Sequence, residues 1–147
     1  MLKFALVFIA LSLLALLLMS LWHRPTRLRP PEQRTIQPCP GTPNCVSSLD
    51  EDATHRIEPL PVLDDDPRAS WQRLQQVIGE QGGDIVFDDG RYLHAVFETR
   101  WLRFRDDLEA VRGVDRIDIR SASRAGRSDF EVNRNRVERL RRRYLAE

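Results

Sequence analysis

The sequence is poor in several residue types that carry particular functions. Of its 147 residues only two are cysteine and three are histidine, and Lys3 is the single lysine among 23 basic residues. No second Cys pair or His pair is available to complete a four-ligand zinc site beside Cys39 and Cys45. The formal net charge of +1 argues against nucleic-acid binding by bulk electrostatics. We therefore expect no metal, no other cofactor and no nucleic-acid partner.

A long apolar run lies near the start of the chain. From Phe4 to Trp22 there are 19 residues, interrupted only by Ser12 and Ser20. At about 1.5 Å per residue, a helix of this length approaches the thickness of the hydrocarbon layer. No Ala-x-Ala pattern follows that would indicate a cleavage site. The run predicts an uncleaved, single-pass anchor over residues 1–22, which would make the cell (inner) membrane a partner through residues 4–22.

The side of the membrane on which the domain lies is indicated by two opposing features. Four arginines between residues 24 and 34 follow the run, whereas only Lys3 and the amino terminus precede it, which favours a cytoplasmic domain. Cys39 and Cys45 are separated by residues that favour tight turns, so they are positioned for a disulfide. Disulfides persist in oxidising compartments. We expect the domain to be extracytoplasmic (periplasmic).

The rest of the chain divides into a linker and one domain. Residues 23–38 are rich in Pro and Arg and have little apolar periodicity, which predicts an extended linker. Residues 39–147 are enough for one domain. Asp66 and Pro67 predict the start of a helix that ends before Gly82. Two hairpins follow, the first with its turn at Asp89-Gly90. After a predicted capping box of Ser128 and Glu131, apolar residues recur at helical spacing to the C-terminus, namely Phe130, Val137, Leu140 and Tyr144.

The alternation of residues predicts which face of each strand is buried. In the first hairpin Leu93, Ala95 and Phe97 share the apolar face, and His94 and Glu98 lie on the other. The second hairpin continues both faces, with the following residues inward: Leu108, Ala110, Ile117 and Ile119. The predicted fold class is α+β, an antiparallel four-stranded sheet with two helices on one face, preceded by one N-terminal transmembrane helix.

Three stretches carry a family resemblance, and they occur in consistent order and spacing. They are Cys39-Pro-Gly-Thr-Pro-Asn-Cys-Val-Ser-Ser48, the stretch from Tyr92 to Asp107, and the stretch from Ile119 to Asp129 with Asn133 and Arg134. Together they resemble the family catalogued as domain of unknown function 1499, over roughly residues 39–142. One departure is Glu131, where that family often has glycine. The resemblance implies membrane or envelope placement and no assigned activity.

A turn after the last predicted strand is the best candidate for ligand binding. A strand end, a glycine-bearing turn and a helix N-terminus lie within nine residues, an arrangement that can present amides and guanidinium groups to an anion. The candidate residues are Arg120, Ser121, Ser123, Arg124 and Arg127. The same residues could instead serve as turn, cap and ion-pair residues.

A second candidate is catalytic. His94 stands in a predicted strand and could act as a general base on Ser121 or Ser123, with a nearby aspartate. However, the sequence has neither a Gly-x-Ser-x-Gly nor a His-Glu-x-x-His motif, and a strand histidine commonly has a structural role. We therefore expect a non-catalytic, membrane-tethered envelope module for an anionic ligand, lipid or protein partner. The alternative is a hydrolase-type enzyme using His94.

Overall fold

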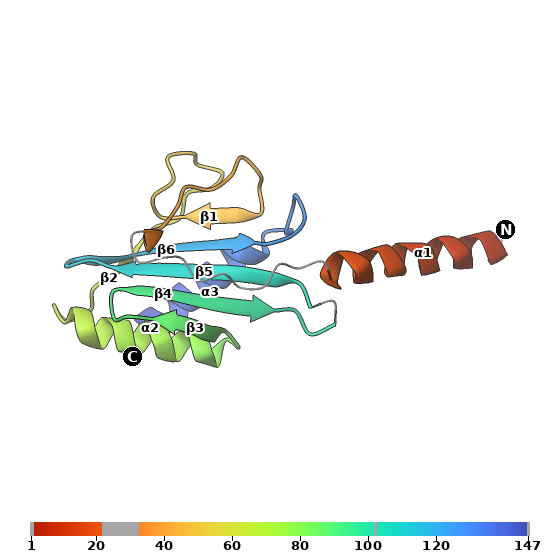
Figure 1. The fold of residues 1–147 in the computed structure, drawn as a ribbon. Helices are drawn as coiled ribbons and strands as arrows, with labels where there is room; N and C mark the ends of the chain where they lie inside the picture. Colours follow the sequence, from red (N-terminus) through yellow and green to blue (C-terminus); the bar gives the residue numbers. More distant parts are fainter. Residues whose placement is uncertain (1, 22–32, 102, 147) are drawn as a thin grey trace.

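The structure is a computed structural model that describes residues 2–21, 33–101 and 103–146. Within these ranges it contains three helices and a sheet of six antiparallel strands (Figure 1). The elements follow in the order α1 (Leu2–Leu21), β1 (Cys45–Ser47), β2 (Leu60–Pro61), α2 (Pro67–Glu80), β3 (Asp84–Asp88), β4 (Tyr92–Glu98), β5 (Arg105–Arg112), β6 (Arg116–Ser123) and α3 (Val132–Leu145).

The sheet corrects the predicted number of strands. Its order is β1-β6-β5-β4-β3, and β2 also pairs with β6. The four predicted strands are present as β3 to β6, but β1 and β2 extend the sheet at the β6 side. Strands of three and two residues are too short to show a period-two pattern, so the prediction of four strands was wrong.

The apolar run at the start of the chain forms α1, which projects away from the sheet (Figure 1). No helix within the described ranges has the length and hydropathy that are needed to cross a membrane. The fold prediction that included a transmembrane helix is therefore corrected. The predicted span also ran to Trp22, whereas α1 ends at Leu21 and Trp22 lies outside the described residues.

The helix α2 begins where the sequence predicts. The Asp66 side chain accepts hydrogen bonds from the backbone N–H groups of Arg68 and Ala69, at 2.9 and 3.0 Å, and Pro67 occupies the first turn. These bonds satisfy amides that have no partner inside the helix. After Glu80 the chain reverses through Gly82, whose φ of 81° is readily adopted by glycine.

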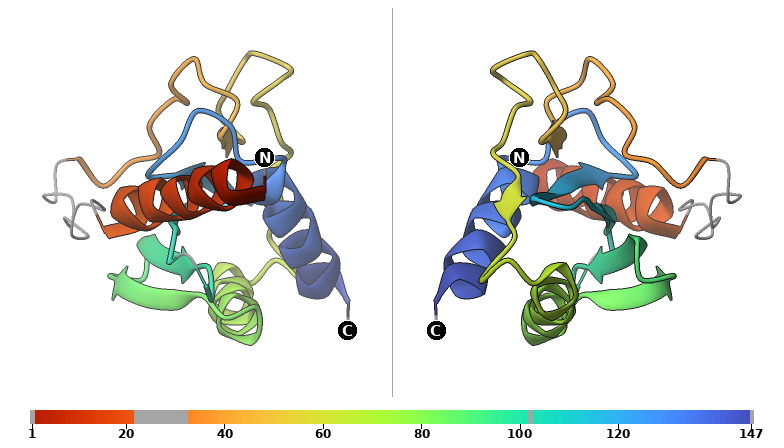
Figure 2. Two further views of the ribbon diagram at one scale, coloured as in Figure 1. Left: turned by 90° about the vertical axis from the view of Figure 1, so that its right-hand side faces the viewer. Right: turned by 90° about the vertical axis from the view of Figure 1, so that its left-hand side faces the viewer.

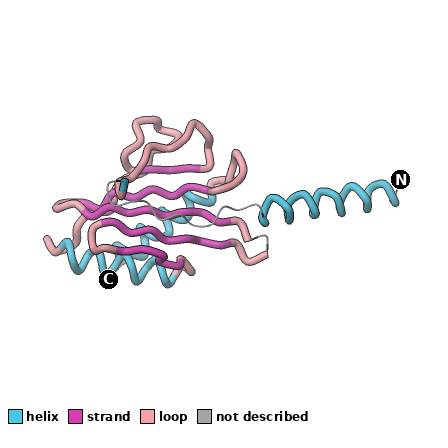
Figure 3. Tube along the Cα trace, in the orientation of Figure 1, coloured by secondary structure: helices cyan, strands magenta, loops and turns pink. Residues whose placement is uncertain are grey.

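Both helices α2 and α3 pack on the same face of the sheet (Figures 2 and 3). The residues predicted to face inward on β4, β5 and β6 all belong to one buried cluster that also includes helix side chains such as Leu74 and Leu140. The prediction of the buried face is confirmed. Removing this much apolar surface from water is the main stabilising contribution to the domain.

The opposite face of the sheet is polar, and a segment without regular secondary structure crosses it. We call this segment, residues 33–39, the strap. The Arg34 guanidinium lies 4.1 Å from the centre of the Phe87 ring and 3.2 Å from Asp89, and Ile36 is buried. Figure 2 shows the strap, in orange, on the side of the sheet away from α2 and α3.

Candidate functional site

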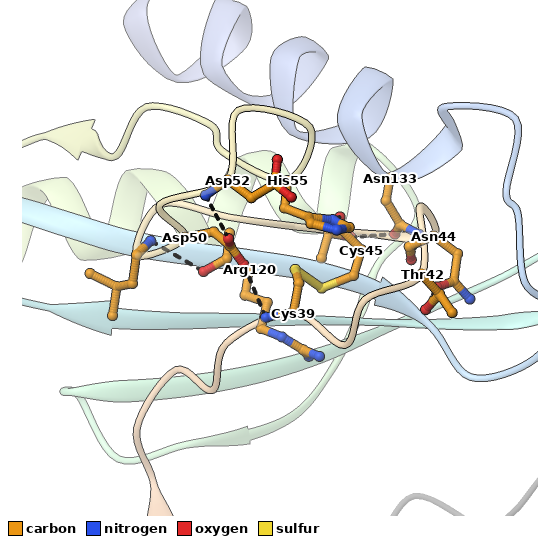
Figure 4. The surroundings of a disulfide bond; sticks show 12 residues. Cys39, Thr42, Asn44, Cys45, Asp50, Asp52, His55, Arg120 and Asn133 are labelled. Atoms are coloured by element: carbon orange, nitrogen blue, oxygen red, sulfur yellow. Dashed lines mark hydrogen bonds between the residues drawn. A yellow bond between two sulfur atoms is a disulfide. The ribbon is translucent and has the colours of Figure 1, made fainter.

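A disulfide joins the strap to the edge of the sheet. Cys39 and Cys45 are bonded, as the sequence predicts, and Cys45 is the first residue of β1 (Figure 4). The backbone N–H of Cys39 donates to the Asp50 carboxylate at 3.2 Å. The carbonyl of Cys45 lies 2.9 Å from Nδ1 of the buried His55. The strap is therefore held on the polar face at its C-terminal end by a covalent bond.

His94 and Arg120, two predicted site residues, lie on the polar face in one row across three strands. His94 pairs in register with Glu109, and Glu109 pairs with Arg120. Glu109 is buried and accepts hydrogen bonds from the Tyr92 hydroxyl at 2.6 Å and from Arg120 at 3.0 Å. Nδ1 of His94 and Nε of Arg120 are buried, and neither has a hydrogen-bond partner among the described residues. Most of the hydrogen-bonding groups of this row are therefore paired with other groups of the protein.

A second ion cluster lies beside that row on the same face. Nε2 of His94 is 2.6 Å from Asp107, and Arg124 donates two hydrogen bonds to the same carboxylate, at 2.9 and 2.6 Å. Burial by itself would raise the pKa of Asp107, but the hydrogen bonds from His94 and Arg124 outweigh it and lower the pKa to about 2. The carboxylate is therefore ionised in nearly the whole pH range, and Arg124 is held as its partner.

The two predicted serines lie on the other face of the sheet. Ser121 is fully buried, and its hydroxyl donates to Oδ1 of Asn133 at 2.6 Å. The Nδ2 group of Asn133 donates to the Ser123 hydroxyl at 2.9 Å. Successive strand residues point to opposite faces, so the sheet separates both hydroxyls from His94. The structure does not bring together the general base and nucleophile of the catalytic alternative.

The start of α3 differs from the predicted capping box. The helix begins at Val132, and Glu131 makes no side-chain cap hydrogen bond. Asp129 performs that role, because its carboxylate accepts from the backbone N–H groups of Glu131 and Asn133 at 3.2 and 2.8 Å. A carboxylate of the chain itself therefore occupies the place where an anion would bind at this helix N-terminus.

One end of the sheet gathers two connections. Glu98 at the end of β4 pairs with Arg105 at the start of β5, so residues 99–104 form the connection there. Asp106 pairs with Ser123, the last residue of β6, so the turn of residues 124–131 leaves the sheet at the same end. The backbone N–H of Arg124 donates to the carbonyl of Arg105 at 3.0 Å and joins the two.

This end exposes large apolar side chains that the sequence analysis did not single out as a site. Trp101 is 84% exposed, Phe130 90% and Val132 40%. We call these three residues the aromatic end, together with Arg100, which precedes Trp101, and Arg127, which stands three residues before Phe130. Large apolar side chains that are exposed at one end of a domain are a common feature of interaction surfaces.

The backbone at Phe130 and Glu131 is left-handed, with φ of 53° and 64°. For residues with a Cβ, this conformation costs on the order of 1–3 kcal/mol each and persists only where surrounding structure enforces it. Here the Asp129 cap and the Asn133 hydrogen bonds enforce it. Phe130 is thereby kept outside the apolar stripe of α3 in which the sequence placed it. A glycine at position 131 would adopt this backbone without that cost.

The arginines of the aromatic end outnumber the carboxylates that are available to them. The Arg100 guanidinium lies 5.5 Å from the Trp101 ring. Arg103 and Arg105 share a single carboxylate, Glu98, whose pKa is lowered by hydrogen bonds first from Arg105 and then from Arg103. Within the described ranges no carboxylate lies within ion-pair distance of Arg100 or Arg127. Glu131, between Phe130 and Val132, is exposed and pairs with Arg134 at 3.2 Å, so the charges left without an ion-pair partner among the described residues here are those of Arg100 and Arg127.

A pocket of about 300 Å³ opens beside these residues, between the end of the sheet and the start of α3. Its walls are mainly apolar, and they include Phe104, Ala125, Phe130 and Val132, with Leu16 of α1 at one side. The polar residues among its walls are Thr99, Arg105, Asp106, Ser123, Ser128 and Asp129. The pocket is at the lower limit of volume for a small-molecule site.

The structure thus distributes the six predicted site residues over three places. His94, Arg120 and Arg124 lie in the ion clusters of the polar face, and Ser121 is buried under α3. Ser123 lines the apolar pocket, and Arg127 is exposed beside it. Within the described residues no three His, Cys, Asp or Glu side chains are grouped to hold a metal ion. That no metal or other cofactor is bound stays a prediction.

These features define an α+β domain that has helices on one face of its sheet and a disulfide-held strap on the other. The chain belongs to the family described as Protein of unknown function (DUF1499), whose model matches residues 35–143. The family resemblance of the sequence is thereby confirmed. No curated protein and no solved structure gives a significant match to the chain.

Proposed function

We propose that this domain is a non-catalytic module that docks on an anionic lipid surface through its aromatic end. The observation that carries the proposal is the coincidence of the two most exposed aromatic side chains of the domain with arginines that lack carboxylate partners within the described ranges. Aromatic residues are favoured at the boundary between hydrocarbon and water. Arginine beside them adds attraction to anionic headgroups, about 1 kcal/mol per residue near the surface.

The charge arrangement supports a lipid surface more than a soluble anion. A small anion needs several convergent donors, but Asp129 occupies the amides at the start of α3 and Asp107 occupies Arg124. Arg100 is instead next to the exposed Trp101 in the chain, and Arg127 stands three residues before the exposed Phe130. Such a surface can place its rings at headgroup level while its guanidinium groups contact phosphates.

The disulfide supports an oxidising compartment as the location of the proposed lipid contact. A bond between Cys39 and Cys45 is stable in an oxidising environment and is generally reduced in the cytosol. We therefore place the proposed lipid contact on the extracytoplasmic (periplasmic) side of the cell (inner) membrane. An envelope protein as partner has no comparable support, because no described feature selects a protein surface over a lipid one.

The test is flotation of the full-length chain with vesicles of phosphatidylcholine alone or with phosphatidylglycerol. We expect the double variant Trp101→Ser/Phe130→Ser to bind mixed vesicles at least about tenfold more weakly, since inserting one such ring is worth 1.5–3 kcal/mol. The matched control is Val114→Ser. Val114 is 86% exposed in the turn between β5 and β6, at the opposite end of the sheet.

The electrostatic part is tested with Arg100→Gln/Arg127→Gln. We expect this variant to lose most of the preference for phosphatidylglycerol and most of the salt dependence of binding. Arg68→Gln, which removes an exposed arginine at the start of α2, should change neither. Because α1 is the same in every protein, its contribution cancels. Equal vesicle binding by Trp101→Ser/Phe130→Ser and by Val114→Ser would reject the proposal.

A further inference from the structure

We infer that the pocket beside the aromatic end holds one hydrocarbon chain of an anionic, single-chain amphiphile such as a fatty acid. This inference deepens the proposed function and rests on it. It adds that the domain takes an individual chain into its own structure, beyond contact with a lipid surface.

The first argument is that the polar groups around the pocket are already bonded within the protein. Asp106 is paired with Arg136, and the Ser123 hydroxyl accepts from Asn133. The Ser128 hydroxyl and the Asp129 carboxylate both accept from backbone amides at the start of α3. A polar ligand would gain few new hydrogen bonds here and would lose those that it makes with water.

The second argument is that the remaining surface of the pocket is suited to hydrocarbon. Phe104, Ala125, Phe130 and Val132 supply apolar walls around a space of about 300 Å³. Phe130 is a wall of the pocket and is also 90% exposed, so one of its faces remains for a ligand to cover. The strained backbone at Phe130 and Glu131 keeps the ring at the pocket instead of in the core.

The third argument concerns the headgroup. Arg105 lines the pocket and shares Glu98 with Arg103, and Arg127 is an exposed neighbour of Gly126 in the pocket wall. Asp129 also lines the pocket, so a carboxylate at the end of a bound chain would lie on the side of Arg105 and Arg127 and away from Asp129. The pocket also continues directly into the aromatic end through Phe130 and Val132, so a chain can pass between lipid surface and pocket.

The experiment uses the full-length chain and lauric acid with a terminal diazirine, below its critical micelle concentration. After irradiation, cross-linked peptides are mapped by mass spectrometry. We expect adducts in the two peptides that carry the pocket walls, one with Thr99 and Phe104 and the other with Ala125, Phe130 and Val132. Unlabelled lauric acid should compete with the probe. Adducts confined to α1, or labelling that does not saturate, would overturn the inference.

Variants that fill the pocket separate this inference from the proposed function. Ala125→Phe and, independently, Val132→Phe should each reduce labelling of these peptides about tenfold, because the added ring occupies the space of the chain. Val114→Phe should not. Flotation with anionic vesicles should persist in Ala125→Phe, because Ala125 is not part of the aromatic end. Unchanged labelling in the pocket variants would reject the pocket as the site of the chain. The proposed docking on a lipid surface would still be supported if vesicle binding were lost in Trp101→Ser/Phe130→Ser.

Discussion

The two faces of the sheet are made by the same strands but are stabilised in different ways. Toward the helices, alternate residues such as Leu108 and Ile119 form a continuous apolar core, with one ion pair between Asp106 and Arg136 at its edge. Toward the strap, Glu109 and Asp107 anchor networks of charged groups. The comparison teaches that a polar sheet face need not be a binding groove, because most of its polar groups pair with one another and a strap held by a disulfide crosses it.

The largest effect should come from breaking the ion pair on the helix side. Arg136 is buried, pairs with Asp106, donates to Ser121 at 3.0 Å and lies 4.6 Å from the Phe97 ring. Arg136→Met leaves a buried carboxylate without its partner, so we expect a loss of about 3–5 kcal/mol in the free energy of unfolding. Urea denaturation measures it.

The matched control is Arg139→Met, an exposed position on the same helix, which should cost less than about 0.5 kcal/mol. Combining Arg136→Met with Asp106→Leu should recover much of the loss, since an apolar pair can replace a buried ion pair. If Arg136→Met were as stable as Arg139→Met, the ion pair would contribute little to the free energy of unfolding. The proposed contrast between the two faces of the sheet would then be wrong on this point.

On the strap side, the next effect should come from the disulfide. Cys39→Ser/Cys45→Ser removes a bond that closes a loop of sequence separation 6, and we expect a loss of about 2 kcal/mol through greater freedom of the unfolded chain. The strap should also exchange its amide hydrogens faster, whereas amides of α2 and α3 should change only with global stability. Uniform acceleration throughout the domain would contradict the separate attachment of the strap.

An effect of about the same size concerns the dependence of stability on pH. The pKa of Asp107 is about 2 in the folded protein, below its ordinary value of 3.8. Its contribution, about 2 kcal/mol, is therefore complete above the unfolded pKa and is lost as the pH falls through about 2. The stability difference between wild type and Asp107→Asn should shrink over this range. A difference that is constant from pH 5 to 2 would exclude this role.

Much of the sheet could be predicted from the sequence because hairpins leave local signals. The Asp89-Gly90 pair and the alternation around Leu93 and His94 predicted both the turn and the two faces, and the register confirms them. The helix start at Asp66 was also predictable, because a cap depends on neighbouring residues alone. These features require no knowledge of distant contacts.

Features that depend on distant contacts were missed. The short strands β1 and β2 exist because they pair with β6, far along the chain. The start of α3 moved to Val132 because Asn133 is held by Ser123 and by the carbonyl of Asn44. The local pattern predicted a helix cap at Ser128, three residues before the observed cap position at Glu131. The predicted transmembrane helix is the remaining difference, and it was inferred from the length of an apolar run alone.

The candidate site was only partly visible in the sequence. The turn around Ser123 and Arg127 was recognised, but as an anion site, and the structure finds an apolar pocket there. Phe130 was assigned to the helix core, because its spacing fits the apolar stripe and its left-handed backbone cannot be read from spacing. Trp101 carried a usable signal, since it stands between arginines in the connection of two strands, where an exposed aromatic residue has no structural purpose.

The bond between Cys39 and Cys45 has a mechanical consequence. A pulling force applied to the chain before Cys39 would pass through the sulfur atoms to the first residue of β1 and would bypass residues 40–44. That load would be borne by the hydrogen bonds between β1 and β6, at one margin of the sheet. Helices α2 and α3, with the apolar layer beneath them, would be the last parts of the domain to experience a force applied from its N-terminal side.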